Sequence, residues 1–174
     1  MAKHSTIRIG ICGWGNVATA LYSALVANRR QLLKKYNLEI VCIGARRDNP
    51  TLKIPSDIKV HRNIFDVLNE DIDVLVELIG GIDTAYELIS KACKKKINVV
   101  TANKAVIYER GAKLFKASKE AGVSIYFESS VCAGTPIIKL LKTDLAANRI
   151  SKISGMLNGT TNFILSQMEA GNTY

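Results

Sequence analysis

The stretch from Ile7 to Leu21 reads IRIGICGWGNVATAL and decides the fold. Residues 7–12 are typical of a buried β-strand, and the apolar positions that follow the glycines have the spacing of a helix. Between the two, residues 13–18 match the pattern G-x-G-x-x-[G/A]. In this pattern the first glycine permits a tight turn, the second lets a pyrophosphate approach the backbone, and a small third residue allows close helix-to-strand packing. The stretch therefore predicts a dinucleotide-binding turn.

Strands and helices are predicted to alternate after this turn. We expect helices over residues 17–36, 85–96 and 111–121, strands over 39–43, 73–79, 99–100 and 123–127, and a short strand and helix within 60–69. Such alternation favours parallel strands with helical crossovers. The predicted fold class is α/β, a doubly wound parallel sheet of the Rossmann type.

The regular alternation of predicted strands and helices ends after Pro136. There the sequence predicts a helix over 137–147, a strand over 150–157 and the start of a helix over 163–168. We therefore expect a nucleotide-binding domain over residues 1–135 and the start of an α+β second domain over 136–174. A helix that starts so close to the last residue suggests a truncated form of a longer chain.

Composition narrows the classes of protein. The chain has 174 residues with a formal net charge of +9, and its basic residues lie in short groups without interleaved aromatics, so we expect no nucleic-acid partner. Such a charge does attract anionic cofactors. The four cysteines are widely spaced without a C-x-x-C pair, which is typical of buried free thiols in a reducing compartment. The sequence shows neither an apolar N-terminal segment nor an apolar run long enough to span a bilayer, so we expect a cytoplasmic protein with no membrane partner.

The end of the second predicted strand bears on the choice of cofactor. An acidic residue there would bind the adenosine ribose of NAD, whereas arginine accommodates the 2′-phosphate of NADP. The sequence has Arg46 and Arg47 first, followed by Asp48. Because guanidinium groups pair well with phosphate, NADP is the preferred prediction, and Asp48 leaves NAD open.

Three later stretches follow predicted strands and should meet at the carboxyl edge of the sheet. ELIGG, residues 77–81, ends in two glycines that let the backbone pass close to the nicotinamide half of a cofactor. TANKA, residues 101–105, places Lys104 just beyond its strand. The small-residue loop over 128–136 offers carbonyl groups that could coordinate a hard cation.

Taken together, GWGNVA, ELIGG, VVTANKA, the loop over 128–136 and GMLNGTTNFIL resemble the homoserine dehydrogenase family, in order and over residues 7–168. The resemblance implies reduction of L-aspartate 4-semialdehyde to L-homoserine with a nicotinamide cofactor, within the biosynthesis of threonine, methionine and isoleucine. It also implies that the Rossmann domain precedes a domain for substrate binding and dimerisation, and that the full-length protein is a homodimer.

The resemblance implies roles residue by residue. Lys104 would lie between the nicotinamide and the substrate as the catalytic residue, and Thr160 would approach the substrate. The residues implied to bind the cofactor are Gly13, Trp14, Gly15, Asn16 and Val17 at the pyrophosphate, Arg46, beside Arg47, at the adenosine phosphate, and Ile79, Gly80 and Lys104 at the nicotinamide. Those implied to bind a monovalent cation, sodium or potassium, mainly through carbonyls, are Glu128, Val131, Ala133 and Thr135.

Two alternatives stay open at this point. An aspartate-semialdehyde dehydrogenase would need a nucleophilic thiol, for which Cys132 is the candidate. A non-catalytic NAD(P)-sensing module would need none of the substrate residues. The family's acidic substrate-binding segment, with a second catalytic lysine, lies beyond the NGTTNFIL stretch, so we expect this chain to bind nucleotide but to have little activity alone.

Overall fold

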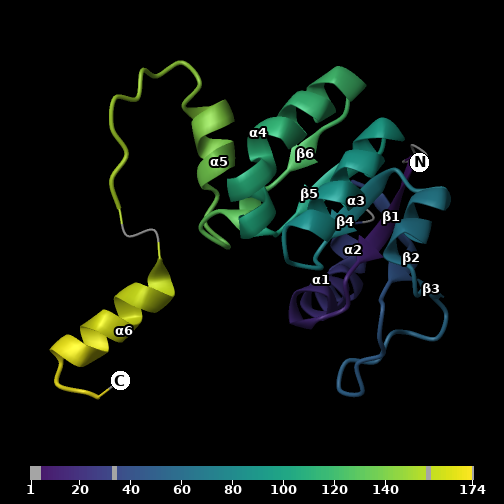
Figure 1. Ribbon diagram of the computed structural model, residues 1–174, viewed down its shortest axis with the longest axis horizontal. Coiled ribbons are helices and arrows are strands. Elements are labelled where there is room, and N and C mark those ends of the chain that lie inside the picture. Colours follow the sequence, from purple (N-terminus) through teal and green to yellow (C-terminus); the bar gives the residue numbers. More distant parts are fainter. Residues whose placement is uncertain (1–4, 33–34, 156–157, 174) are drawn as a thin grey trace.

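The computed structural model describes residues 5–32, 35–155 and 158–173, and its centre is one sheet of six parallel strands (Figure 1). Their order is β3-β2-β1-β4-β5-β6, so the sequence order reverses at β1. The strands are β1 (Thr6–Cys12), β2 (Asn37–Gly44), β3 (Lys59–His61), β4 (Val74–Glu77), β5 (Asn98–Thr101) and β6 (Ile125–Tyr126). This arrangement confirms the predicted doubly wound sheet, whose ligands bind where the strand order reverses.

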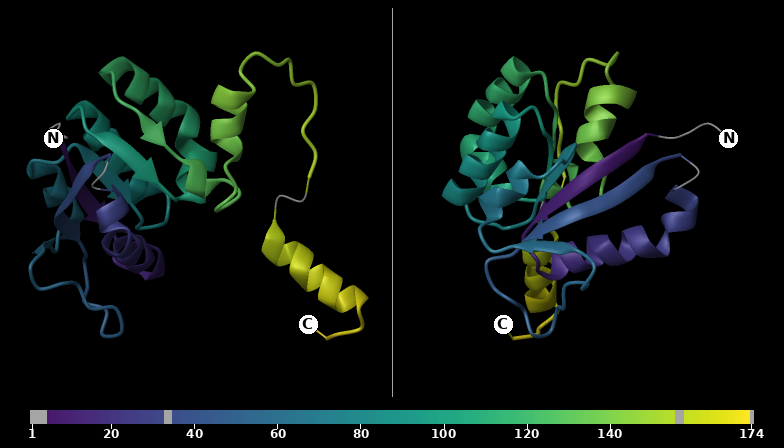
Figure 2. Two further views of the ribbon diagram at one scale, coloured as in Figure 1. Left: turned by 180° about the vertical axis from the view of Figure 1, so that it is seen from behind. Right: turned by 90° about the vertical axis from the view of Figure 1, so that its right-hand side faces the viewer.

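Helices cover both faces of the sheet. Helix α1 (Asn16–Ala27) packs on one face through a core that includes Ile11 and Ile43. Helices α3 (Asp83–Lys94) and α4 (Lys104–Ala121) pack on the other face with the short 3-10 helix η1 (Ile64–Asn69), as the right-hand view in Figure 2 shows. No helix within the described residues has both the length and the apolar character that a membrane span needs.

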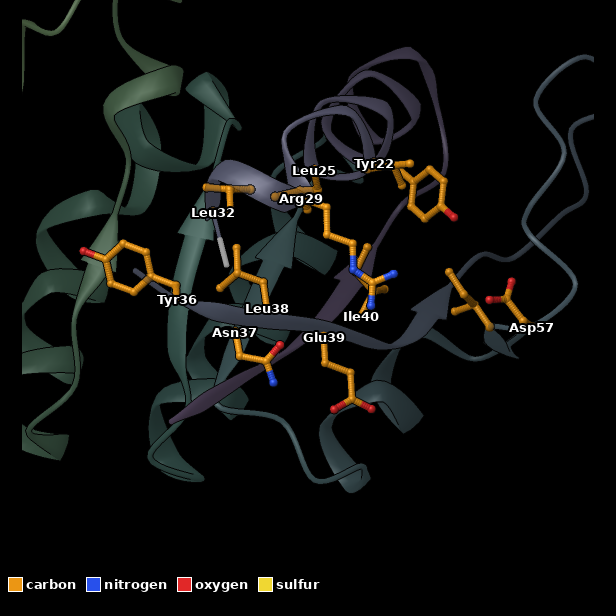
Figure 3. Close-up of a pocket in the computed structure, with 12 residues that line it drawn as sticks. Tyr22, Leu25, Arg29, Leu32, Tyr36, Asn37, Leu38, Glu39, Ile40 and Asp57 are labelled. Carbon is orange, nitrogen blue, oxygen red and sulfur yellow. The ribbon is translucent and has the colours of Figure 1, made fainter. Parts of the chain in front are cut away.

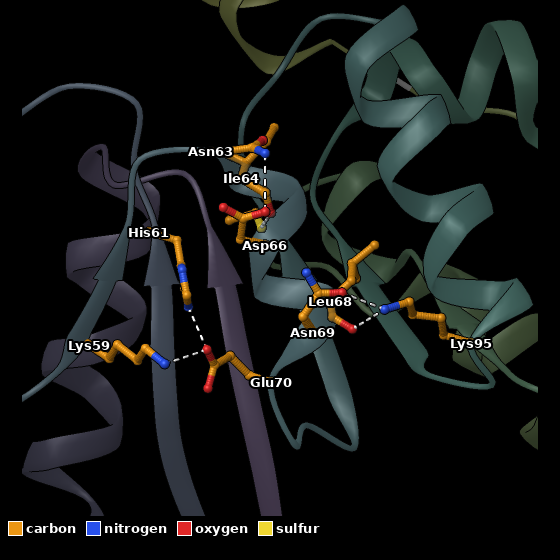
Figure 4. Close-up of polar contacts among 10 residues, drawn as sticks. Lys59, His61, Asn63, Ile64, Asp66, Leu68, Asn69, Glu70 and Lys95 are labelled. Carbon is orange, nitrogen blue, oxygen red and sulfur yellow. Dashed lines mark hydrogen bonds and ion pairs between the residues drawn. The ribbon is translucent and has the colours of Figure 1, made fainter.

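The edge strand β3 is held by one carboxylate (Figure 4). Glu70 lies directly after η1. Its Oε1 accepts from Lys59 Nζ at 2.7 Å and pairs with His61 Nε2 at 2.8 Å. The His61 carbonyl in turn accepts the N–H of Ala45 at 2.9 Å. These contacts keep the end of β3 beside the end of β2.

Before Pro136, two predicted helices differ by more than two residues from their bounds in the structure. The helix expected over 17–36 ends at Ala27, and a short helix α2 (Arg29–Leu32) follows. The break falls at Asn28, whose side-chain amide donates to the Ala24 carbonyl at 2.8 Å, beside the ordinary helical bond of its backbone N–H to the same carbonyl at 3.0 Å. The helix expected from residue 111 begins earlier, at Lys104, because Asn103 caps it.

The part after Pro136 differs more from the prediction. Helix α5 (Ile137–Lys139) runs into a π-helical turn (Leu140–Asp144), which accounts for most of the helix expected over 137–147. The strand expected over 150–157 is wrong for residues 150–155, which have no regular structure, and residues 156–157 lie outside the described part. A strand needs a partner, and Ile153 is 63% exposed instead of paired.

Helix α6 (Gly159–Glu169) confirms the last predicted helix and begins four residues earlier than expected. Figures 1 and 2 show it apart from the sheet. The division of the chain at residues 135 and 136 stays a prediction.

Candidate cofactor and active site

The turn after β1 requires glycine at its first position. Gly13 has a φ of +99°, and a Cβ there would lie 2.6 Å from the Leu78 carbonyl oxygen. Its N–H donates to the Gly44 carbonyl at 2.8 Å, and the Leu78 N–H donates to the Cys12 carbonyl at 2.8 Å. The turn therefore joins the carboxyl ends of β1, β2 and β4, where the strand order reverses.

The N-terminus of α1 is suited to an anion. Gly15 occupies the N-cap position and supplies no side-chain acceptor, and the first turn of α1 contains no acidic residue. By contrast, Asn103 caps α4 and Asn158 caps α6 through side-chain oxygens. A Cβ on Gly15 would meet no atom within 4 Å, so the space above the N-terminus is open. Free helical N–H groups and the positive end of the helix dipole bind phosphate, and this part of the site fits a pyrophosphate.

Trp14 lies in the same turn, but its side chain points into the core. The indole Nε1 donates to the Leu52 carbonyl at 2.9 Å, and the ring packs edge-on against Tyr22 with 5.9 Å between centroids. The residue is only 9% exposed. Trp14 can therefore meet a ligand through its backbone, while its side chain holds the loop between β2 and β3.

Arginines gather where β2 ends. Arg46 and Arg47 are exposed, and neither has an ion-pair partner within the described part of the chain. Asp48 is held by Arg62, whose Nη2 lies 2.8 and 3.0 Å from the two carboxylate oxygens. Arg62 also donates to the Ala45 carbonyl at 3.3 Å. Asp48 is thus ion-paired with Arg62, whereas Arg46 and Arg47 have no ion-pair partner within the described residues.

Sequence reasoning missed Arg62. It lies 14 residues from Asp48, and the register between β2 and β3, which pairs Gly44 with His61, brings the two together. A basic residue directly after a short strand was the only signal in the sequence.

The turn after β4 consists of left-handed glycines. Gly80 and Gly81 have φ values of +72° and +73°, and a Cβ on either would meet nothing within 4 Å. Both are exposed, and Ile79 before them is half-buried. The predicted nicotinamide turn therefore lies open at the carboxyl edge, next to the glycine turn of β1.

Lys104 is the first residue of α4 and is exposed. The preceding residue, Asn103, donates from its side-chain amide to the Gly81 carbonyl at 2.7 Å, so the structure brings Lys104 beside the turn at residues 79–81. A helix N-terminus is a poor place for a cation, because the helix dipole repels it. The position of Lys104 is therefore not explained by helix stability.

The loop predicted to hold a cation has an unusual backbone. Cys132 and Ala133 have φ values of 56° and 48°, a left-handed backbone conformation that residues other than glycine rarely adopt. Within the described residues, the carbonyls of Val131 and Ala133 accept no hydrogen bond, whereas those of Glu128 and Thr135 accept from Val131 and Ile137. Free carbonyls of this kind fit a hard cation.

The Glu128 carboxylate has another partner. It accepts the N–H groups of Ile138 and Lys139, each at 2.8 Å, and so anchors the start of α5. Within the described residues, no group of three His, Cys, Asp or Glu side chains lies close enough to hold a metal ion.

Thr160 is not brought to this edge. It is exposed in the first turn of α6, where the Asn158 side chain accepts the N–H of Thr161 at 3.0 Å. In Figures 1 and 2 this helix lies apart from α4, the helix that begins at Lys104.

All four cysteines are free thiols, and Cys12, Cys42 and Cys93 are buried as predicted. Burial raises the pKa of Cys12 to about 12 and that of Cys42 to about 11. Both thiols are therefore unreactive near neutral pH. Cys132, the candidate nucleophile of the alternative dehydrogenase, is half-buried.

A separate hollow of about 430 Å³ lies at the other end of the sheet (Figure 3). It is lined by α1 and α2 and by the first half of β2, with Arg29, Glu39 and Asp57 among the labelled residues. Because Asn37 and Leu38 start β2, this hollow is far along the strand from the glycine turn. It is not part of the site at the carboxyl edge.

Fold and site together define a dinucleotide-binding Rossmann domain. Residues 13–128 match the family model described as "Homoserine dehydrogenase, NAD binding domain", and residues 136–174 match the model described as "Homoserine dehydrogenase". The chain belongs to the homoserine dehydrogenase family, as the resemblance predicted. The alternative family, aspartate-semialdehyde dehydrogenase, is not supported.

The relatives found by sequence similarity are homoserine dehydrogenases as well. The chain is 42% identical to the homoserine dehydrogenase of Pseudomonas aeruginosa over 97% of its length, and 40% identical to that of Synechocystis over 94%. It spans 39% and 38% of those proteins, about two fifths of their length.

Solved structures are similar as well. The crystal structure of a homoserine dehydrogenase from Thiobacillus denitrificans superposes with a TM-score of 0.90 at 35% identity, over 96% of this chain and 39% of that one. A hyperthermophilic archaeal homoserine dehydrogenase in complex with NADPH gives a TM-score of 0.81 at 30% identity, over 97% of this chain and 58% of that one.

Proposed function

We propose that this chain is the cofactor-binding part of an enzyme that reduces L-aspartate 4-semialdehyde to L-homoserine, in the biosynthesis of threonine, methionine and isoleucine. The observation that carries the proposal is the shared edge of three elements: the uncapped N-terminus of α1, the turn at Gly80 and Gly81, and Lys104 at the start of α4. A dinucleotide bound at the first element would extend toward the other two.

The cofactor in this proposal is NADP, with NAD as the weaker ligand. The N–H groups at residues 15–17 would bind the pyrophosphate, and Arg46 and Arg47 the 2′-phosphate. The pairing of Asp48 with Arg62 supports NADP, because Arg62 competes for the carboxylate that would accept from the ribose hydroxyls of NAD. The archaeal relative that binds NADPH supports the same choice.

The chemistry follows from the residues at the edge. The bound cofactor supplies the hydride. Ile79 and Gly80 would line the nicotinamide end, and the Lys104 ammonium group would donate to the aldehyde oxygen. A cation at that oxygen stabilises the negative charge that develops as the hydride arrives. Thr160, on α6, would reach the substrate once the second domain is closed against this edge.

We further propose a bound monovalent cation, a homodimer and a cytoplasmic location for the full-length protein. The carbonyls of Glu128, Val131, Ala133 and Thr135 would bind sodium or potassium. The full-length protein would be a cytoplasmic homodimer acting on a small-molecule substrate. Exposed apolar side chains on α6, Phe163 and Leu165 among them, support a buried partner surface in the full-length protein.

The test is a lysine substitution in the full-length protein, assayed with aspartate semialdehyde and NADPH. Lys104→Ala should lower kcat by about 100-fold or more, because the developing charge loses its cation. Lys113→Ala removes another exposed lysine from the same helix and should keep kcat within about twofold. Undiminished turnover in Lys104→Ala would refute the role of Lys104, and no reduction of the aldehyde by the unchanged protein would refute the proposed reaction.

A further inference from the structure

Glu77 is a buried carboxylate that the proposed reaction does not use. It ends β4 and has no exposed surface. Within the described residues no lysine or arginine pairs with it. Its Oε1 accepts the N–H of Ile79 at 2.9 Å, and its Oε2 accepts the hydroxyl of Thr101 at 2.5 Å. Burying an acid in this way costs free energy, so an apolar residue would serve the sheet better.

The hydrogen bonds continue from Thr101 into the next helix. Thr101 Oγ1 accepts the N–H of Asn103 at 3.0 Å. Asn103 Oδ1 accepts the N–H of Val106 at 3.2 Å and thereby caps α4. Asn103 Nδ2 donates to the Gly81 carbonyl at 2.7 Å. The network therefore starts at the turn after β4, crosses to β5 and α4, and returns to the same turn.

We propose that Glu77, Thr101 and Asn103 are positioning residues that fix Lys104 relative to the turn at residues 79–81. The proposal rests on the proposed function, in which Lys104 and this turn face the two reacting partners. None of the three side chains needs to touch substrate or cofactor.

The geometry favours positioning over local stability. Gly80 and Gly81 are exposed and have no side chains to pack, so besides the packing of Ile79 on the core the turn is held by two tethers, the Glu77 bond to Ile79 and the Asn103 bond to Gly81. Helix capping needs only the Oδ1 atom of Asn103, and it does not explain why the amide reaches across to Gly81. A fully satisfied buried network is rigid, and rigid placement of reacting groups governs rate.

The experiment uses two substitutions in the full-length protein. Asn103→Ser keeps a capping oxygen for α4 but cannot reach Gly81, and Thr101→Val removes the hydroxyl at nearly constant volume. Each should lower kcat by about 10- to 100-fold, as misplaced reacting groups do. The Kd for NADPH, measured by nicotinamide fluorescence, should stay within about threefold because the phosphate contacts are untouched. Thr101→Ser keeps the hydroxyl and should keep kcat near the wild-type value.

Two controls separate positioning from folding. Ser118→Ala removes a buried hydroxyl of the same helix, which donates to the Phe115 carbonyl at 3.0 Å, and should leave kcat unchanged. Hydrogen exchange measured without nucleotide should rise at residues 79–81 in Asn103→Ser. If that exchange is unchanged, or if kcat stays at the wild-type value in both Asn103→Ser and Thr101→Val, the positioning role is overturned.

A double variant tells this inference apart from the proposed function. If Asn103 acts through Lys104, adding Asn103→Ser to Lys104→Ala should lower kcat by no more than about twofold further, because residues that act as one unit are not additive. A full multiplicative loss would overturn the positioning role and leave the role of Lys104 intact. Wild-type activity in Lys104→Ala alone would remove the proposed role of Lys104 itself.

Discussion

The guanidinium group of Arg62 holds both carboxylate oxygens of Asp48, at 2.8 and 3.0 Å. This pair lies directly after β2 and β3, where the adenosine end of a dinucleotide is bound in Rossmann folds. A single ion pair at the surface contributes little to stability. The pair matters for electrostatics, because Arg62 offsets the negative charge of Asp48, the carboxylate next to Arg46 and Arg47.

Arg62→Ala should therefore shift cofactor preference toward NADH. The freed Asp48 carboxylate would repel the 2′-phosphate, and we expect NADPH affinity to fall about tenfold, which is about 1.4 kcal/mol. NADH affinity should be unchanged or higher. Fluorescence titrations of both nucleotides measure this, and Arg62→Ala with Asp48→Asn should recover part of the NADPH affinity. An unaltered NADPH to NADH ratio in Arg62→Ala would contradict this effect of Arg62.

The two glycines of the first turn should respond differently to alanine. Gly13→Ala introduces a Cβ against the Leu78 backbone at a positive φ, and should destabilise the fold by about 2 kcal/mol or more. Gly15→Ala places its Cβ in open space and should cost less than about 1 kcal/mol. Urea unfolding measures both. Gly15→Ala should instead weaken NADPH binding, because the methyl group occupies the approach to the α1 N-terminus; wild-type affinity there would count against the phosphate site.

Acid should weaken the fold through Asp73. The Arg8 side chain and its backbone N–H donate to this carboxylate and hold its pKa below the ordinary value of 3.8. A lowered pKa contributes stability above the unfolded-state pKa, and that contribution is lost as the pH falls through the folded-state value. Asp73→Asn should therefore be less stable at neutral pH and decline less steeply below about pH 4. Urea unfolding across this range measures it.

The control for Asp73 is Asp57→Asn, an exposed carboxylate in the loop before β3. Its decline with acid should match that of the unchanged protein. If Asp73→Asn also declines with the unchanged slope, the Arg8 pair does not contribute to acid stability.

Glu128 should act as an anchor for α5 and not as a charged cation ligand. Glu128→Ala leaves the N–H groups of Ile138 and Lys139 without their acceptor, and should cost about 1–3 kcal/mol. Any activation by sodium or potassium should persist in Glu128→Gln, because the proposed ligand is the carbonyl. Thermal unfolding and assays at varied salt measure the two effects. Loss of cation activation without a loss of stability would reverse the assignment.

Much of the fold could be predicted from local pattern. The glycine turn and the alternation of strands and helices depend on residues close together in sequence, and the structure confirms both. Asn28 shows the limit, because apolar spacing continues past it although α1 ends there. The strand expected over 150–157 shows another, since strand propensity has no effect without a partner strand.

The sequence by itself determined that a phosphate-binding turn leads into α1, and that Lys104 follows a strand to the same edge, because both depend on near neighbours in the chain. Only the tertiary structure decided which groups surround them. Arg62 meets Asp48 through the register of β2 and β3, and Glu77 meets Thr101 through the register of β4 and β5. The physical reason is that parallel strands pair residues far apart in sequence, and a lone carboxylate in an apolar strand says nothing about its partner.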